Sequence, residues 1–218
     1  MTTFIFVRHA TNDWVKKGRL PGWKKGIHLN AEGKKQAEGV AQRLKPLRLD
    51  AIFSSHLERA QETARYIAEG RKLRVTIRPN LADLKTGDWT GRSIKQLART
   101  KLWKAVQGRP THTRMPGGET FSEMQGRLVG ELEQIRSRFP KGTVAVVSHS
   151  DAIKSIVAHY LKLDLDNFQR IIINPASISI VHVDDGSARL VRLNDTGPLQ
   201  QAARPKRGIK PRTSRTRK

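Results

Sequence analysis

The sequence predicts an α/β protein with three layers, in which helices cover both faces of a mostly parallel sheet. Short apolar runs alternate along the chain with segments whose apolar residues recur at helical spacing, which is the order of elements typical of a parallel sheet. Two strand patterns joined by a tight turn close the chain and make the sheet mixed. We expect about six strands, over 3–7, 49–55, 73–79, 142–150, 176–183 and 188–195.

The helices are expected between these strands. Pro46 ends the first helical pattern, and Gly70 closes the second. The predicted helical segments are 29–46, 57–70, around 93–106, 119–138 and 151–161.

The composition favours one domain in a cytoplasmic setting. The chain has 218 residues, which suffices for one hydrophobic core. It contains no cysteine, which excludes disulfides and thiolate chemistry. No apolar run approaches the ~18 residues that a membrane helix needs. We expect a domain over 1–198, followed by a basic tail over 199–218.

The charge is strongly positive. Lys and Arg number 42 against 19 Asp and Glu, a formal charge of +23. The last 18 residues hold eight basic residues and no acidic one, a composition typical of disorder. The remainder still carries about +15 by subtraction, and such a field favours anionic partners. The tail is interpreted either as a solubilising segment with incidental RNA affinity or as a segment with a specific role.

Two predicted strands end in histidine. "FVRH" ends at His9, and "VVSH" ends at His149. Ligand sites in such sheets lie beyond the carboxyl ends of the strands. A histidine buried at the end of a strand also needs partners for its ring nitrogens. The pair therefore favours a functional site over two structural histidines.

Arg59 stands in the first turn of the helix expected after the second strand, within "SSHLERAQET". A helix N-terminus favours anions, and a guanidinium binds phosphate through two parallel hydrogen bonds. The alternative is a surface arginine that pairs with Glu58 or Glu62.

Five motifs in order resemble the histidine phosphatase superfamily, the phosphoglycerate-mutase-like proteins. They are "VRHA", "SSHLERAQET", "GDWTG", "PGGET" and "VSHSDAIK", and the resemblance spans about residues 3–195. It implies a phosphoglycerate-mutase-like fold with no metal and no other cofactor. It also implies that His9 is the nucleophile and becomes phosphohistidine.

The same resemblance assigns the residues that bind the phosphate. Arg8, Arg59 and a protonated His149 would form a cationic cradle, and the Asn12 amide would donate to the phosphate. Fixed cations suit phosphoryl transfer, because negative charge resides on the equatorial oxygens.

Asp83 matches the position where the family usually places a glutamate that protonates the leaving group. Its side chain is one methylene shorter, and burial would raise its pKa toward that of a useful acid. The alternatives are a capping or surface role for Asp83, or the use of Asp88 or Glu119 as the acid.

Three positions depart from the family pattern. Ala10 and Ser150 replace glycines that often follow the two histidines, and Val15 replaces an asparagine. Trp23 lies on the loop after the nucleophile and is a candidate for the pocket border, although packing is the more frequent role of tryptophan.

The leading functional prediction is a metal-independent phosphatase that hydrolyses a small phosphorylated metabolite. Mutase-type phosphoryl transfer is the second prediction, and the chain has no obvious insertion to cover the site. The third is a catalytically weak phosphatase fold that binds RNA or another polyanion, with non-specific nucleic acid contact through the tail. No membrane partner is expected.

Overall fold

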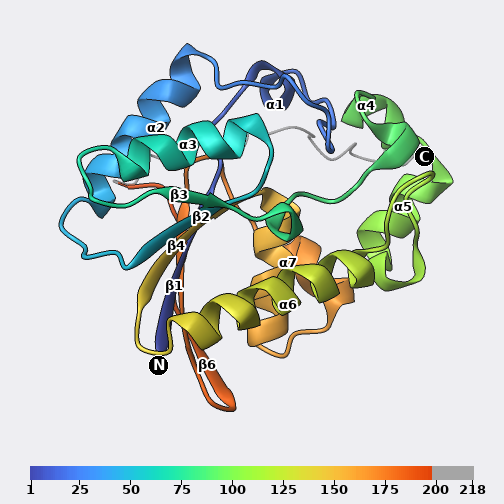
Figure 1. The fold of residues 1–218 in the computed structure, drawn as a ribbon. Coiled ribbons are helices and arrows are strands. Elements are labelled where there is room, and N and C mark those ends of the chain that lie inside the picture. Colours follow the sequence, from blue (N-terminus) through green and yellow to red (C-terminus); the bar gives the residue numbers. More distant parts are fainter. Residues whose placement is uncertain (198–218) are drawn as a thin grey trace, which may run out of the picture.

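A six-stranded mixed sheet lies at the centre of the computed structural model, which describes residues 1–197 (Figure 1). The strands are β1 (Thr2–Arg8), β2 (Ala51–Ser54), β3 (Val75–Ile77), β4 (Thr143–Ser148), β5 (Ile178–Asp184) and β6 (Ser187–Asp195). Their order across the sheet is β3-β2-β4-β1-β5-β6. The first four of these run parallel, whereas β5 and β6 are antiparallel to their neighbours. The predicted mixed, mostly parallel sheet is confirmed.

Helices cover both faces of this sheet, which confirms the three layers (Figure 1). Helices α2 (Ala31–Leu44) and α3 (Glu58–Ala68) pack on one face. Helices α6 (Phe121–Arg138) and α7 (Ser150–Tyr160) pack on the other. The short helix α1 (Asp13–Lys16) follows β1, and α4 (Ile94–Leu97) and α5 (Lys101–Gly108) lie in the long segment before α6.

The alternation of side chains along β1 builds both cores. Phe4 and Phe6 are fully buried in the core under α6 and α7. Ile5 and Val7 are buried in the core under α2 and α3. Successive side chains of a strand point to opposite faces, so an uninterrupted apolar run is what a doubly covered strand requires.

The segment 93–106 differs from the single helix that its pattern predicts. It forms two helices, α4 and α5, with a break before Lys101. Thr100 causes the break, because its hydroxyl accepts the Trp103 N–H at 3.2 Å and donates to the Leu97 carbonyl at 2.7 Å. A side chain that caps a new helix competes with continuation of the previous one.

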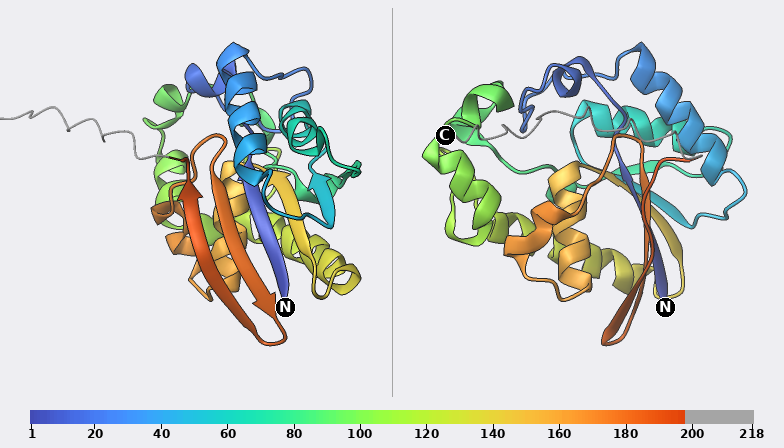
Figure 2. Two further views of the ribbon diagram at one scale, coloured as in Figure 1. Left: turned by 90° about the vertical axis from the view of Figure 1, so that its left-hand side faces the viewer. Right: turned by 180° about the vertical axis from the view of Figure 1, so that it is seen from behind.

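The two ends of the sheet have different roles. In both views of Figure 2, the turn of the β5–β6 hairpin lies at the same end as the N-terminus, because β5 is antiparallel to β1. The carboxyl ends of β1, β2 and β4 lie at the opposite end. Within residues 1–197, no helix has the length and apolar character to cross a membrane. The basic tail predicted over 199–218 lies outside the described residues.

Candidate active site

His9 and His149 lie side by side where β1 and β4 end. The two strands pair in parallel with Arg8 opposite Ser148, and each histidine is the next residue along its strand. The His9 backbone N–H donates to the Ser148 carbonyl at 2.9 Å, which extends the ladder by one bond. The two ring centroids are 5.1 Å apart. Both imidazoles therefore occupy the edge of the sheet where parallel sheets bind ligands.

The His9 ring is held in one tautomer. Its Nδ1 lies 2.8 Å from the backbone carbonyl of Ala10, and a carbonyl only accepts, so Nδ1 carries the proton and Nε2 carries the lone pair. Burial lowers the pKa of His9 well below its ordinary value, and the charges of Arg59 and Arg8 lower it further. The His9 ring is therefore unprotonated at neutral pH, and its free Nε2 has the lone pair that a nucleophile requires.

Arg59 is a fully buried cation and not a surface residue. It is the second residue of α3, and its side chain has no solvent exposure. Its Nη2 donates to the Gly22 carbonyl at 2.9 Å and lies 3.7 Å from an Asp83 carboxylate oxygen. Glu62, which offered an alternative partner, instead contacts His28 and accepts from the Leu29 N–H. The surface ion pair weighed from the sequence is therefore wrong.

Several buried donors around His9 have no partner within the described residues. Arg59 contributes Nε and Nη1, Arg8 contributes Nε, and Asn12 contributes Nδ2. The Asn12 oxygen is used, because it caps α1 by accepting the Trp14 and Val15 N–H groups. Buried polar atoms in proteins are nearly always hydrogen-bonded, so a cluster of unpaired donors indicates a site for an acceptor. Donors of this charge suit an oxyanion such as phosphate.

His149 completes the cluster from the end of β4. Its Nε2 lies 2.8 Å from the Ser55 hydroxyl, and its Nδ1 is unpartnered and 3.8 Å from Asp83. Burial lowers the pKa of His149 well below its ordinary value, and the positive charge of Arg59 lowers it further. This shift favours a neutral ring in the structure as it stands, and the protonated His149 stays a prediction for the site with phosphate bound. Ser55 was not singled out from the sequence, although its position at the end of β2 is the same signal that identified both histidines.

Asp83 carries its carboxyl group into this cluster. Its Oδ2 atom lies between Arg59 and His149, 3.7 Å from Arg59 Nη2 and 3.8 Å from His149 Nδ1. Both distances are longer than a hydrogen bond. Its side chain is 18% exposed. Burial raises the pKa of Asp83 to about 6, against a smaller lowering by Arg59. The carboxyl group is thus a proton donor near neutral pH, the property that a general acid requires.

The other two carboxylates considered as acids are placed elsewhere. Glu119 forms a two-point ion pair with Arg127, with bonds of 2.6 and 3.0 Å, and accepts the Lys85 N–H. Asp88 lies against Gly117, whose absent side chain leaves room for it. Neither residue lines the cavity beside His9.

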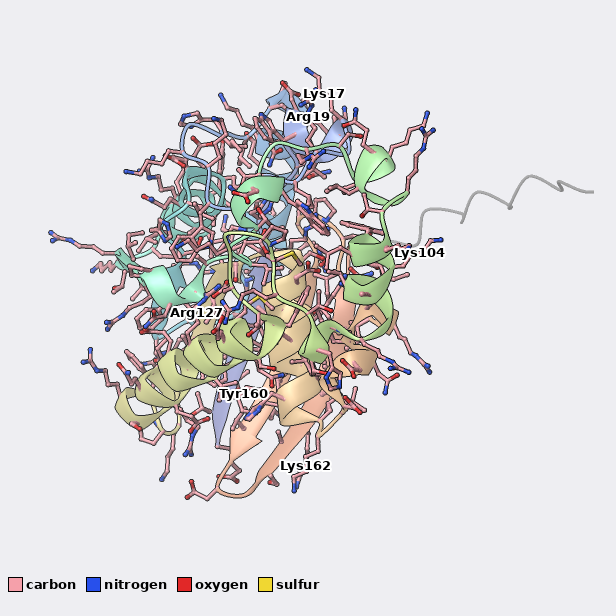
Figure 3. The ribbon with its side chains drawn as sticks, turned by 90° about the vertical axis from the view of Figure 1, so that its right-hand side faces the viewer. Lys17, Arg19, Lys104, Arg127, Tyr160 and Lys162 are labelled. Atoms are coloured by element: carbon pink, nitrogen blue, oxygen red, sulfur yellow. The ribbon has the colours of Figure 1, made fainter. Side chains whose placement is uncertain are left out.

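Arg127 clamps the backbone that carries Asp83. Its guanidinium donates to the carbonyls of Asn80, Ala82 and Asp83 at 2.7–2.9 Å. Trp23 donates its indole N–H to the same Asp83 carbonyl at 2.6 Å, and the Arg127 guanidinium stacks 5.5 Å from the Trp23 ring. Figure 3 labels Arg127 on α6. Trp23 therefore lies behind Asp83 and does not border the cavity, and sequence inspection did not identify the clamp because its contacts join distant segments.

A cavity of about 270 Å³ opens beside His9 and Arg8. Asp83 lies on its wall together with Ser150 and Val15, two of the positions that depart from the family pattern. The other lining residues were not predicted, because they reach the cavity from five separate segments. They are Arg19, Leu20, Pro21, Ile94, Trp103, Gln107, Asp151, Lys154 and Gln169.

Comparison with known proteins agrees with this geometry. The family model of the histidine phosphatase superfamily (branch 1) matches residues 4–196. The chain belongs to the histidine phosphatase superfamily. This histidine phosphatase is 32% identical over 198 residues to phosphoserine phosphatase 1 of Hydrogenobacter thermophilus, an alignment that covers 90% of this chain and 93% of the relative.

Two further matches also cover most of the chain. The metal-independent phosphoserine phosphatase of Arabidopsis thaliana is 30% identical over 214 residues, which cover 96% of this chain and 88% of that protein. Among solved structures, YhfR of Bacillus stearothermophilus superposes with a TM-score of 0.84 at 26% identity, over 89% of this chain and 98% of that one. The predicted family, the fold and the phosphatase class are confirmed by these matches.

Proposed function

We propose that this histidine phosphatase hydrolyses small phosphomonoesters without a metal ion, through a phosphohistidine on His9. The observation that carries the proposal is the set of unpartnered buried donors on Arg8, Asn12 and Arg59 around a histidine with a free Nε2, beside the unpartnered Nδ1 of His149. Donors held in place before substrate arrives stabilise the charge that develops on a transferring phosphoryl group. Phosphoryl transfer needs little else from the protein.

In the first half-reaction, the His9 Nε2 lone pair forms a bond to phosphorus while the bond from phosphorus to the ester oxygen breaks. The equatorial oxygens accept hydrogen bonds from the cradle residues. Asp83 donates its proton to the leaving oxygen, so that the alcohol departs neutral. The donor is the carboxyl group whose pKa burial raises to about 6.

In the second half-reaction, a water oxygen attacks the phosphorus of the phosphohistidine. The Asp83 carboxylate, which lost its proton in the first step, takes a proton from that water. The bond from phosphorus to Nε2 breaks, inorganic phosphate leaves, and the starting protonation states of His9 and Asp83 are restored. Atoms and charges therefore balance over the cycle with no further cofactor.

Phosphoserine is the first substrate to examine. Two relatives with at least 30% identity over most of the chain carry the name phosphoserine phosphatase. The cavity beside His9 measures about 270 Å³, just below the usual range of about 300–1,000 Å³ for ligand pockets. Both observations support a small leaving group.

The test uses 4-nitrophenyl phosphate and phosphoserine in the presence of EDTA, with rapid alkaline quenching followed by intact mass measurement. We expect turnover that persists with the chelator and a mass gain of one phosphoryl group. His9→Ala abolishes both signals. His182→Ala is the matched control, because His182 lies on β5, paired with Thr3 and away from the site, and it retains both signals.

Two outcomes would overturn the proposal. Turnover that disappears with EDTA and returns with a divalent metal would exclude metal-independent chemistry. Turnover that persists in His9→Ala would exclude the phosphohistidine. Addition of phosphoglycerate to the same assay tests the mutase prediction, because a mutase phosphoenzyme transfers its phosphoryl group to phosphoglycerate faster than to water.

A further inference from the structure

The cavity beside His9 continues past the phosphate cradle to a second set of polar side chains. Asp151 and Lys154 come from the first turns of α7, and Gln169 comes from the 3₁₀ segment Leu165–Arg170. All three line the same cavity as His9 and Arg8. Since the cradle accounts for the phosphate, these side chains face the part of a substrate that leaves.

Lys154 is fixed in place by its neighbours. Its ammonium donates to Asp151 Oδ1 at 3.2 Å and to Gln169 Oε1 at 3.0 Å, and it lies 5.9 Å from the centre of the Phe168 ring. The Lys154 side chain is only 13% exposed. A lysine that is ordered in this way presents a positioned charge, whereas a surface lysine is free to move.

Asp151 is the informative residue, because a carboxylate is unfavourable in a cavity that binds a phosphate dianion. Its side chain is 31% exposed, and within the described residues its Oδ2 accepts no hydrogen bond. A role in stabilising the start of α7 would account for an acid in the first turn. It would not require that acid to share a cavity with Arg8 and His9. A substrate with a cation near its phosphate would offset the repulsion.

We propose that Asp151 and Lys154 form the leaving-group subsite and select a zwitterionic phosphomonoester, namely a phosphorylated amino acid. The ammonium of the substrate pairs with Asp151, and its carboxylate pairs with Lys154, which Gln169 holds in place. The inference rests on the proposed hydrolysis and assigns its substrate class to two side chains. Hydrogen bonds to charged groups are the strong ones, and each is expected to contribute about tenfold or more to selectivity.

The experiment compares four alkyl phosphates that carry different charged groups. Phosphoserine has an ammonium and a carboxylate, phosphoethanolamine has the ammonium alone, 3-phosphoglycerate has the carboxylate alone, and glycerol 1-phosphate has neither. The measured quantity is the ratio of kcat/KM values within each variant. This ratio does not depend on the fraction of folded protein, and a change in the acidity of Asp83 affects all four alkyl esters alike.

Asp151→Asn is expected to lower kcat/KM about tenfold or more for the two ammonium substrates, relative to the other two. Lys154→Met has the corresponding effect on the two carboxylate substrates. Glu133→Gln is the control, because Glu133 pairs with Arg136 at the same sequence spacing on α6 and does not line this cavity. It leaves the four ratios unchanged.

A uniform loss across the four substrates, or no change, would overturn the subsite. An equal loss on glycerol 1-phosphate would show that Asp151 binds hydroxyl groups. Failure of the underlying function has a different signature, since the wild-type protein would then hydrolyse none of the four esters and no 4-nitrophenyl phosphate.

Discussion

Asp83→Asn separates the general acid from the rest of the site. The asparagine keeps the size of the side chain, and the Asp83 carbonyl keeps its bonds to Trp23 and Arg127. The substitution removes the proton that the carboxyl group donates in the first half-reaction and the base that accepts a proton from water in the second. General acid catalysis contributes about 10²–10⁴-fold, so phosphoserine hydrolysis should fall by that factor. In kcat/KM, which reports the transfer of the phosphoryl group to His9, the loss on 4-nitrophenyl phosphate should be less than about tenfold, because its phenolate leaves without a proton.

The raised pKa of Asp83 also predicts how kcat/KM for phosphoserine changes with pH. With the pKa of Asp83 at about 6, about 3% of the carboxyl groups hold a proton at pH 7.5, against about 0.02% at the ordinary value of 3.8. Because the raised pKa retains the acid form below about 6, kcat/KM for phosphoserine should fall about tenfold per pH unit above that value. The assay is the ratio of phosphoserine to 4-nitrophenyl phosphate turnover across pH, which cancels much of the titration of the phosphate groups themselves.

The same substitution is expected to stabilise the fold. Between pH 3.8 and about 6, the unfolded chain loses the Asp83 proton while the native protein keeps it, so native stability falls as the pH rises through this window. Above a pH of about 6, the full loss in the free energy of unfolding has occurred, and it amounts to about 3 kcal/mol. Asparagine does not titrate, so the gain in the free energy of unfolding of Asp83→Asn should grow from pH 4 to pH 7. Equal loss of activity on both substrates, or a stability difference independent of pH, would refute the reasoning.

Three further predictions concern the clamp, the cradle and a helix. Arg127→Lys loses the planar guanidinium that holds the backbone of Asp83, the proposed general acid. It should lower the ratio of phosphoserine to 4-nitrophenyl phosphate turnover about tenfold. Arg71 also donates to three backbone carbonyls, and the control variant Arg71→Lys should leave this ratio unchanged. Inorganic phosphate at 100 times its Kd should stabilise the wild-type protein by about 2.7 kcal/mol in thermal melts, and Arg59→Met should lose this shift; an undiminished shift would exclude the cradle. In α2, Gly39→Ala should stabilise by up to about 1 kcal/mol, whereas a Cβ on Gly33 would lie 2.0 Å from a backbone carbonyl and should destabilise, as denaturant unfolding would show.

The sheet could be predicted from the sequence because each strand is marked by a short apolar run of its own residues. The apolar runs that end at His9 and His149 bury side chains on both faces, and no other element type suits a run of that length between helical segments. Since parallel strands share one carboxyl edge, the proximity of the two histidines followed from the strands. The break before Lys101 was missed, because the hydroxyl of Thr100 competes with an otherwise helical pattern.

The remaining features of the site depend on contacts between distant segments. The sequence around Arg59 is also compatible with a surface position on a helix. In the structure Arg59 is fully buried, and it contacts Gly22 and Asp83 from other loops. The Arg127 clamp joins α6 to a loop more than 40 residues away. Asp151 and Lys154 fit an ordinary helix start with an i,i+3 pair. Only the cavity that they share with His9 distinguishes them.

The protonated His149 expected from the sequence and the neutral one in the structure describe two states of the same site. Burial and the charge of Arg59 hold the imidazole neutral in the structure. A phosphate dianion among the cradle donors brings negative charge beside Arg59, His149 and Asp83, and such a charge favours a protonated imidazole and a protonated carboxyl group. Binding therefore raises the pKa of both groups and draws protons onto the cradle and the acid together. In the proposed mechanism, the substrate itself thus supplies the charge that keeps Asp83 protonated for the leaving oxygen, while His9, with its proton on Nδ1, keeps Nε2 free to attack.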